Sequence, residues 1–322
     1  MTFPSQISEE KILKFTHDGL ERSYLFLDGK IDALVVVLHY FGGGMSSILR
    51  DYFTLSELGF SLLIPQGMSM SWNAGECCGP ALAEKVDDVG FVRKLVQSVL
   101  EEKFSPTTKV YVTGISNGGF LTTRLALQAI KNEDYWIHGI AYVSGYTYDY
   151  DLYEGATKYI QQKGRFPVFA IQGLEDKHVQ PQGCCDNTCC CHIQTPICLS
   201  FRKSIDFWAE INGCDYGKGV APIDPFFDFK NEVAHCFEAK SCEQEVKLCE
   251  FPEMNHQQTF RITGEAVGRF FLQTYRNNNA VQTTINHDKG NLEYRALIIA
   301  LVVGVFLFLV STRRIIYGTF KS

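Results

Sequence analysis

The sequence lacks three features that would each point to a particular kind of protein. It has no block of like charges, and its 30 basic and 36 acidic residues leave a net charge of −6, so a nucleic-acid partner has no electrostatic basis. Its first 14 residues are polar and contain no apolar core segment, so no secretory signal peptide is visible there. It also has no Asn-x-Ser/Thr sequon, so N-glycosylation cannot report on which side of a membrane it lies.

The composition indicates one large folded domain with an appendage. The chain has 322 residues, of which 46% are hydrophobic and 20% charged, enough apolar material to bury a core. Twelve cysteines are many for an ordinary cytosolic enzyme. They indicate an oxidising compartment, a metal site or both.

An uncharged apolar run lies near the C-terminal end, from Ala296 to Val310, and arginines flank it on both sides. As a helix it is about 22 Å long, shorter than a hydrocarbon core of about 30 Å. A buried C-terminal helix is the alternative, but the run is apolar on every face, which favours a membrane anchor. We therefore predict a globular domain, a polar linker, a transmembrane anchor and a short basic tail over 1–276, 277–295, 296–312 and 313–322.

Strand-like and helix-like segments alternate through the globular part, which predicts an α/β fold with a mostly parallel, doubly wound sheet. The expected strands are Leu20–Leu27, Ala33–His39, Phe60–Ile64, Lys109–Thr113, Ile137–Val143, Pro167–Ile171 and Glu245–Phe251. The expected helices are Val86–Leu100, Gly118–Ile130, Ser200–Ile211 and Thr259–Tyr275. Asp87 and Asp88 stand at the start of the first of these helices, where carboxylates favour the helix dipole, so we expect a structural role for them.

A G-x-S-x-G pattern at Gly114–Gly118 carries the first sign of chemistry. It follows the strand Lys109–Thr113 and opens a helix, as a nucleophile elbow requires, and its glycines allow a sharp turn with close packing. The alternative is a glycine-rich turn with an incidental serine. Two further features favour Ser116 as a nucleophile.

The first feature is the segment His39–Gly44, directly after the buried strand that ends at His39. In hydrolases of this architecture the loop after that strand supplies one N–H to the oxyanion hole, and the residue after the serine supplies the other. In this chain we expect these to be the N–H groups of Phe41 and Asn117. His39 itself precedes the serine in the chain and is expected to be structural.

The second feature is the chain order serine, acid, histidine. Glu175 and Asp176 follow the strand Pro167–Ile171, and either carboxylate could orient a histidine. His256 lies between a strand and the last helix, where a loop delivers an imidazole to the carboxyl edge of the sheet. The other later histidines lie beside the acid, in cysteine-rich loops or in the linker: His178, His192, His235 and His287. A neutral imidazole would take the proton of Ser116, and the carboxylate would fix its tautomer.

The central part of the chain resembles the polyhydroxybutyrate-depolymerase-like esterases, a family that includes feruloyl and acetyl-xylan esterases. The resemblance runs from about Phe15 to Phe271. Three segments carry it: Trp72–Gly79, Val86–Phe91 and Val110–Gly119. It implies the α/β-hydrolase fold and hydrolysis of carboxylic esters, with no cofactor and no metal.

The resemblance also bears on particular residues. The acid pattern Gly-x-x-Asp of the family falls on Gly173–Asp176, which selects Asp176 over Glu175, and its histidine loop falls on Asn255–His256. Cys214 and Cys242 match positions that look paired in relatives, which suggests a disulfide. Trp72 is predicted to line the substrate cleft, with a place in the wall or core as the alternative.

Three departures from the family pattern concern the site. Tyr40 stands where a glycine is usual, directly before Phe41. Asn255 and Gln257–Thr259 replace the glycine before the histidine and the tryptophan after it. The segment Cys184–Cys198 carries six cysteines and His192. We expect disulfides there rather than zinc, because the spacing lacks paired C-x-x-C motifs.

Together these observations predict a membrane-tethered serine esterase that works through an acyl-enzyme. Its substrate is an ester of the feruloyl- or acetyl-carbohydrate type or of the hydroxyalkanoate type. The alternative is a catalytically weak, cysteine-rich binding protein on an esterase scaffold. The cysteines favour a lumenal or extracellular domain over a cytosolic, tail-anchored one, and the short apolar run suits a thin bilayer.

Overall fold

The computed structural model of the chain describes residues 12–75, 77–146, 165–183, 200–215, 220–225, 229 and 232–279. The chain divides into two units, Met1–Leu272 and Gln273–Ser322. Within the described ranges no helix is long and apolar enough to cross a membrane, and the predicted anchor over 296–312 lies outside those ranges.

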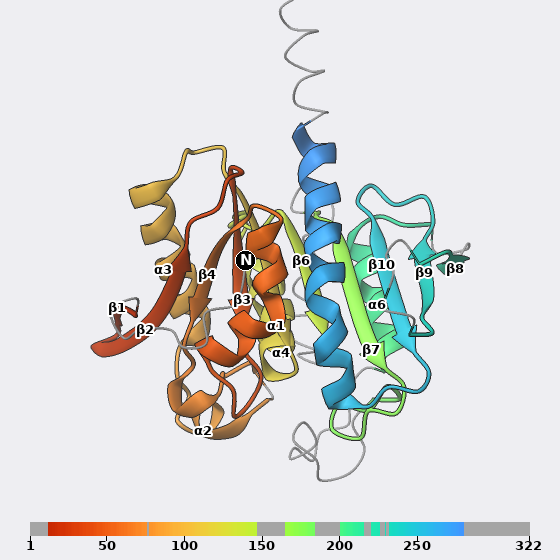
Figure 1. Cartoon of the computed structure of the whole chain (residues 1–322), viewed down its shortest axis with the longest axis horizontal. Helices are drawn as coiled ribbons and strands as arrows, with labels where there is room; N and C mark the ends of the chain where they lie inside the picture. The colour runs from red at the N-terminus through yellow and green to blue at the C-terminus, as the bar shows by residue number, and fades with distance from the viewer. Residues whose placement is uncertain are drawn as a thin grey trace, which may run out of the picture. The chain divides into compact units, whose positions relative to one another are not determined.

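One ten-stranded sheet forms the centre of the first unit (Figure 1). Its strand order is β1-β2-β4-β3-β5-β6-β7-β10-β9-β8. The six strands from β4 to β10 run parallel, and β1, β2, β9 and β8 extend the sheet with antiparallel pairs at its two ends. The strand bounds are Leu13–His17, Leu20–Leu27, Ala33–Leu38, Ser61–Pro65, Lys109–Ile115, Gly139–Val143, Val168–Gly173, Val220–Ile223, His235–Ala239 and Val246–Phe251 for β1 to β10. The predicted mostly parallel α/β sheet is therefore confirmed.

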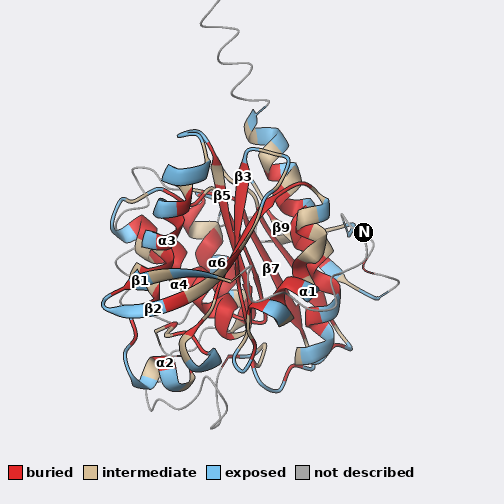
Figure 2. Cartoon of the chain, turned by 60° about the vertical axis from the view of Figure 1, so that its left-hand side comes forward, coloured by how far each residue is buried: buried red, intermediate tan, exposed pale blue. Residues whose placement is uncertain are grey.

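Helices cover both faces of this sheet because the central strands are apolar on both sides. All six residues of β3 are buried, and Leu34, Val36 and Leu38 share a core with residues of α3 and α4. On the opposite face Tyr111 of β5 stacks on Phe271, with ring centroids 4.9 Å apart. Figure 2 shows buried strands between helices with exposed outer faces.

The helices of the first unit have the following bounds. They are α1 (Met45–Glu57), α2 (Gly79–Ala83), α3 (Asp88–Lys103), α4 (Asn117–Lys131) and α6 (Phe201–Ile211), with a short 3₁₀ turn, η2, at Met68–Met70. A last helix begins at residue 256 and passes out of the first unit after 272. Figure 1 shows α1 and residues 256–272 of this last helix on the near face of the sheet, and α6 behind it.

Several elements differ from the sequence-based expectation at the edges of the fold. β1, β8 and β9 were not expected, and α1 lies where no helix was predicted. β8 carries Pro222 and no buried residue, which is typical of an edge strand with little apolar pattern. The helix expected from Val86 begins at Asp88 instead, because the side chain of Asp87 accepts the N–H of Gly90 and caps it.

Three disulfides lie within the part of the chain that the structure describes: Cys77–Cys78, Cys214–Cys242 and Cys236–Cys249. The second is the pair that the family resemblance suggests. The third joins directly opposed residues of β9 and β10, a pairing that depends on strand register. The cysteine-rich segment 184–198 lies outside the described ranges.

Candidate active site

Ser116 sits at a sharp turn between β5 and α4. Its backbone has φ 54° and ψ −119°, a conformation that costs energy for a residue with a side chain. The turn needs both glycines of the motif. A Cβ on Gly114 would lie 2.4 Å from the carbonyl oxygen of Gly118, and one on Gly118 would lie 2.2 Å from that of Leu38. The G-x-S-x-G pattern therefore forms an elbow that holds the hydroxyl at the carboxyl edge of the sheet.

The structure brings Ser116, His256 and Asp176 together in one line of hydrogen bonds. His256 Nε2 lies 3.0 Å from Ser116 Oγ, and His256 Nδ1 lies 2.5 Å from Asp176 Oδ2. The three residues follow β5, β10 and β7 respectively, and the carboxyl ends of parallel strands meet at one edge of the sheet. The arrangement fits a neutral imidazole that accepts the serine proton at Nε2 while Nδ1–H donates to the carboxylate.

The two candidate acids have different environments. Asp176 is 3% exposed, and its Oδ1 accepts the N–H groups of His178 at 2.9 Å and Val179 at 2.8 Å. Glu175 is exposed, and its backbone N–H donates to the carbonyl of Met254. The geometry thus places Asp176, and not Glu175, against the histidine. The other carboxylate oxygen of Asp176 accepts the two N–H groups of its own loop.

His39 fixes the loop that leads to Phe41. Its Nδ1–H donates to the carbonyl oxygen of Tyr40 at 2.8 Å, and its Nε2 accepts the N–H of Gly67 at 2.9 Å. In a trans peptide the C=O and N–H point to opposite sides, so this bond also sets the direction of the Phe41 N–H. Burial lowers the pKa of His39 to about 4. His39 is therefore neutral at pH 7 and acts as a structural residue.

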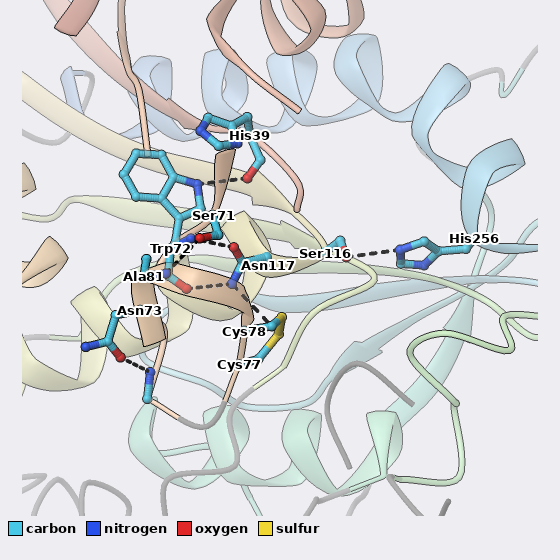
Figure 3. Close-up of a disulfide and its surroundings, with 11 residues drawn as sticks. His39, Ser71, Trp72, Asn73, Cys77, Cys78, Ala81, Ser116, Asn117 and His256 are labelled. Atoms are coloured by element: carbon cyan, nitrogen blue, oxygen red, sulfur yellow. Dashed lines mark hydrogen bonds between the residues drawn. A yellow bond between two sulfur atoms is a disulfide. The ribbon is translucent and has the colours of Figure 1, made fainter. Parts of the chain in front are cut away.

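Asn117 binds the main chain of Trp72 on the other side of Ser116. Its Oδ1 accepts the Trp72 N–H at 2.7 Å, and its Nδ2 donates to the Trp72 carbonyl at 2.9 Å. Its own N–H is at the first position of α4, where a helix leaves amides without intrahelical acceptors. Figure 3 shows Ser116 between Asn117 and His256.

The structure corrects the predicted role of Trp72. Its side chain is fully buried, its Nε1 donates to the carbonyl of His39 at 2.9 Å, and its ring packs on the His39 imidazole. A buried indole with a satisfied N–H cannot form the surface of an open substrate cleft. Trp72 instead joins the loop of His39 to the side chain of Asn117 (Figure 3).

Sequence reasoning missed three neighbours of the site. The ring of Phe260 lies against His256, with centroids 4.7 Å apart, and the exposed His178 ring lies 5.2 Å from His256. The Cys77–Cys78 pair lies beside Asn117, whose Nδ2 is 3.8 Å from Cys77 Sγ. Phe260 could have been found from its spacing, since it stands four residues after His256 and so shares a helix face with it.

One cluster among the described residues has the chemistry of a metal site. The ligand atoms of His17, Asp18 and Asp87 lie within 4.8 Å of one another. Each member already has a partner, because His17 Nε2 contacts both carboxylates and Asp87 caps α3. The cluster therefore connects the β1–β2 turn to the start of α3 through these contacts.

The other carboxylate at this helix start has a separate structural partner. Asp88 is buried, and its Oδ1 accepts a hydrogen bond from Arg22 at 2.7 Å. Its Oδ2 accepts the N–H of Asn73 at 2.7 Å. Burial raises the pKa of Asp88, and the charge of Arg22 opposes that shift. Asp88 thus links β2 to the loop that carries Trp72, a role beyond the expected helix dipole.

A hydroxyl, an imidazole and a buried carboxylate in line, with a helix N-terminus beside the hydroxyl, suit nucleophilic attack on an acyl carbon. No family model matches the sequence, and no curated protein matches it. Among solved structures, the chain is similar to the acetyl xylan esterase from Aspergillus awamori, with 13% identity, a TM-score of 0.51 and coverage of 76% of this chain and 93% of that one. The acylaminoacyl peptidase of Pyrococcus horikoshii matches with 14% identity, a TM-score of 0.48 and coverage of 83% and 41%. With its mostly parallel mixed sheet and this strand order, the chain has the α/β-hydrolase fold.

Proposed function

We propose that this chain is a serine hydrolase that cleaves carboxylic esters through an acyl-enzyme. The observation that carries the proposal is the line of contacts from Ser116 Oγ to His256 and on to Asp176. Ser116 is held in the strained backbone conformation of a nucleophile elbow. The residues around it supply a base, a group that orients the base, and N–H donors for a developing negative charge.

The proposed reaction has two steps. Ser116 Oγ attacks the ester carbonyl carbon while His256 Nε2 takes the hydroxyl proton, and the N–H groups of Phe41 and Asn117 bind the oxyanion. Collapse of the tetrahedral intermediate breaks the ester C–O bond, and His256 gives its proton to the departing alcohol. Water then attacks the acyl-serine with His256 as base, which releases the acid and restores Ser116.

The substrate class rests on the resemblance to the feruloyl, acetyl-xylan and polyhydroxybutyrate esterases. We propose a carbohydrate-linked feruloyl or acetyl ester, or a hydroxyalkanoate oligomer. The test uses the purified full chain in detergent with p-nitrophenyl acetate, then feruloyl, acetyl-xylan and hydroxybutyrate esters, with Ser116→Ala as the matched control. Turnover that disappears in Ser116→Ala supports the proposal. Equal turnover by both proteins, or none by either, contradicts it.

We also propose, from the sequence alone, that the run over 296–312 anchors the chain in a membrane with its folded domain on the lumenal or outer side. The test is protease treatment of intact microsomes that carry the full chain. Protection of the domain, lost when detergent is added, is expected. Complete digestion without detergent, while a lumenal marker survives, would indicate the cytosolic orientation instead.

A further inference from the structure

An aromatic stack connects the oxyanion loop to the histidine of the site. The ring of Tyr40 stacks on Phe260, with centroids 5.3 Å apart and an interplanar angle of 25°. Phe260 in turn meets His256 with centroids 4.7 Å apart and an angle of 66°. The three rings thus form a continuous path from the residue directly before Phe41 to the imidazole that contacts Ser116.

Both ends of this path belong to the proposed catalytic machinery. Tyr40 contributes the carbonyl to which His39 Nδ1 donates at 2.8 Å, and the N–H of the same peptide is that of Phe41. At the other end Phe260 is 9% exposed and lies one helical turn after His256, so its ring packs on the same face. The packed rings therefore provide a route by which a shift of the oxyanion loop would reach the imidazole.

The glycine after this loop makes room for the stack. A Cβ on Gly43 would lie 2.8 Å from Cε2 of the Tyr40 ring, which is closer than carbon atoms approach without strain. The backbone N–H of Gly43 also donates to the carbonyl of Tyr40 at 3.0 Å. The half-buried Tyr40 ring thus lies against both Gly43 and Phe260.

We propose that Tyr40 and Phe260 are positioning residues that set the separation between the oxyanion donor Phe41 and the base His256. This inference rests on the proposed function. Reacting groups must be held within a fraction of an ångström, and a 1 Å displacement can lower the rate about 100-fold. Tyr40 therefore controls kcat, and the substrate affinity depends on it little.

The test compares variants of the full chain on p-nitrophenyl acetate. Tyr40→Ala is expected to lower kcat by about 10- to 100-fold with KM changed less than about threefold, and Tyr40→Phe, which keeps the ring, restores kcat to within about twofold. Tyr135→Ala serves as the matched control, because that exposed tyrosine lies outside the stack. A KM effect without a kcat effect would make Tyr40 a substrate contact and would overturn the inference, as would an unchanged kcat.

Gly43→Ala tests the stack without removing a ring. It should lower kcat by displacing the Tyr40 ring, and this effect should vanish when Gly43→Ala is added to Tyr40→Ala, because the obstructing ring is gone. Equal effects of Gly43→Ala in the two backgrounds would contradict the inference. The double-mutant cycle stays informative even where Tyr40→Ala lowers the melting temperature.

A readout that does not depend on turnover separates the inference from the proposed function. The proton between His256 Nδ1 and Asp176 should give a downfield ¹H NMR line, and Tyr40→Ala should shift or broaden it, whereas Tyr40→Phe should keep it. An inactive wild type whose line responds in this way would refute the esterase and leave the positioning role standing. If the wild type is active, and Tyr40→Ala changes neither its NMR line nor its kcat, the positioning role alone is refuted.

Discussion

The carboxamide of Asn117 hydrogen-bonds the main chain of Trp72 with both of its ends, at 2.7 Å through Oδ1 and at 2.9 Å through Nδ2. The residue that supplies one proposed oxyanion donor is thereby joined to the loop behind the site. Trp72 in turn donates to the carbonyl of His39, at the start of the loop that supplies the other donor. The two proposed oxyanion donors thus belong to one network of hydrogen bonds.

Asn117→Ala should damage both stability and catalysis. It leaves the buried N–H of Trp72 without its acceptor, at about 1–3 kcal/mol, whereas the Trp72 carbonyl keeps the N–H groups of Ala74 and Cys78. It also removes the side-chain contact that holds the turn after Ser116 against this loop. Denaturant unfolding and the kcat on p-nitrophenyl acetate measure the two effects. Asn212→Ala is the matched control, since that buried asparagine donates to the carbonyl of Phe166 in another part of the fold. If the two variants retain the same kcat, the role given to Asn117 is wrong.

The two adjacent acids should differ sharply when each is neutralised. Asp176→Asn should lower kcat by about 10⁴-fold, because an amide cannot hold His256 in the required tautomer or stabilise its charged form. Glu175→Gln, on an exposed side chain, should change kcat less than about twofold. The kcat values of the two purified variants, measured by steady-state kinetics, show which carboxylate is required. A sensitive Glu175 together with a tolerant Asp176 would reverse the assignment of the acid.

The sequence predicted the centre of this site better than its surroundings. The elbow was predictable because Gly114 and Gly118 are needed for contacts that no residue with a Cβ allows. The chain order of acid and base narrowed the histidines to His256, but the choice between Glu175 and Asp176 needed the family resemblance. Nothing in the residues themselves says which of two neighbouring carboxylates turns inward.

The errors concern burial and register, which depend on the whole fold. Trp72 was predicted to line the substrate cleft, with the wall or core as the alternative, and the structure gives the alternative. A sequence does not show that an indole N–H finds a partner such as the carbonyl of His39. The Cys236–Cys249 disulfide follows from the register of β9 on β10, and β9 has too short an apolar pattern to be predicted. The spacing of Phe260 from His256 could have predicted their contact, but the stacking of Tyr40 on Phe260 depends on the tertiary fold.

Acid should destabilise the fold through two histidines, the buried His39 and the partly buried His138. Burial lowers the pKa of His39 and of His138 from 6.5 to about 4, so between these values the unfolded chain binds protons that the folded chain does not. The contribution of each histidine to the free energy of unfolding is therefore complete above about pH 6.5. It falls as the pH drops towards 4, by about 1.4 kcal/mol per pH unit for each histidine. Urea unfolding at pH 7, 6 and 5 measures this slope. His138→Gln should reduce it, and a slope that is unchanged in this variant would contradict the assignment.

The neighbouring carboxylates Asp87 and Asp88 should make unequal contributions to stability. Asp88→Ala leaves the buried Arg22 without its carboxylate partner, although Arg22 keeps a hydrogen bond to the carbonyl of Gln66. This should lower the free energy of unfolding by about 3–5 kcal/mol. Asp87→Ala removes a partly exposed helix cap, at about 1 kcal/mol. Unfolding curves of the two variants provide the comparison. A larger loss for Asp87 would show that Arg22 finds another partner.

The central claim is that Ser116 is a nucleophile, and covalent labelling tests it most directly. The full chain is treated with a serine-directed fluorophosphonate, and the modified residue is located by peptide mass spectrometry while residual activity on p-nitrophenyl acetate is followed. The account predicts one label per chain, on Ser116, with activity lost in step and no label on Ser116→Ala. An active protein that takes no label, or takes it on another residue, would contradict the account.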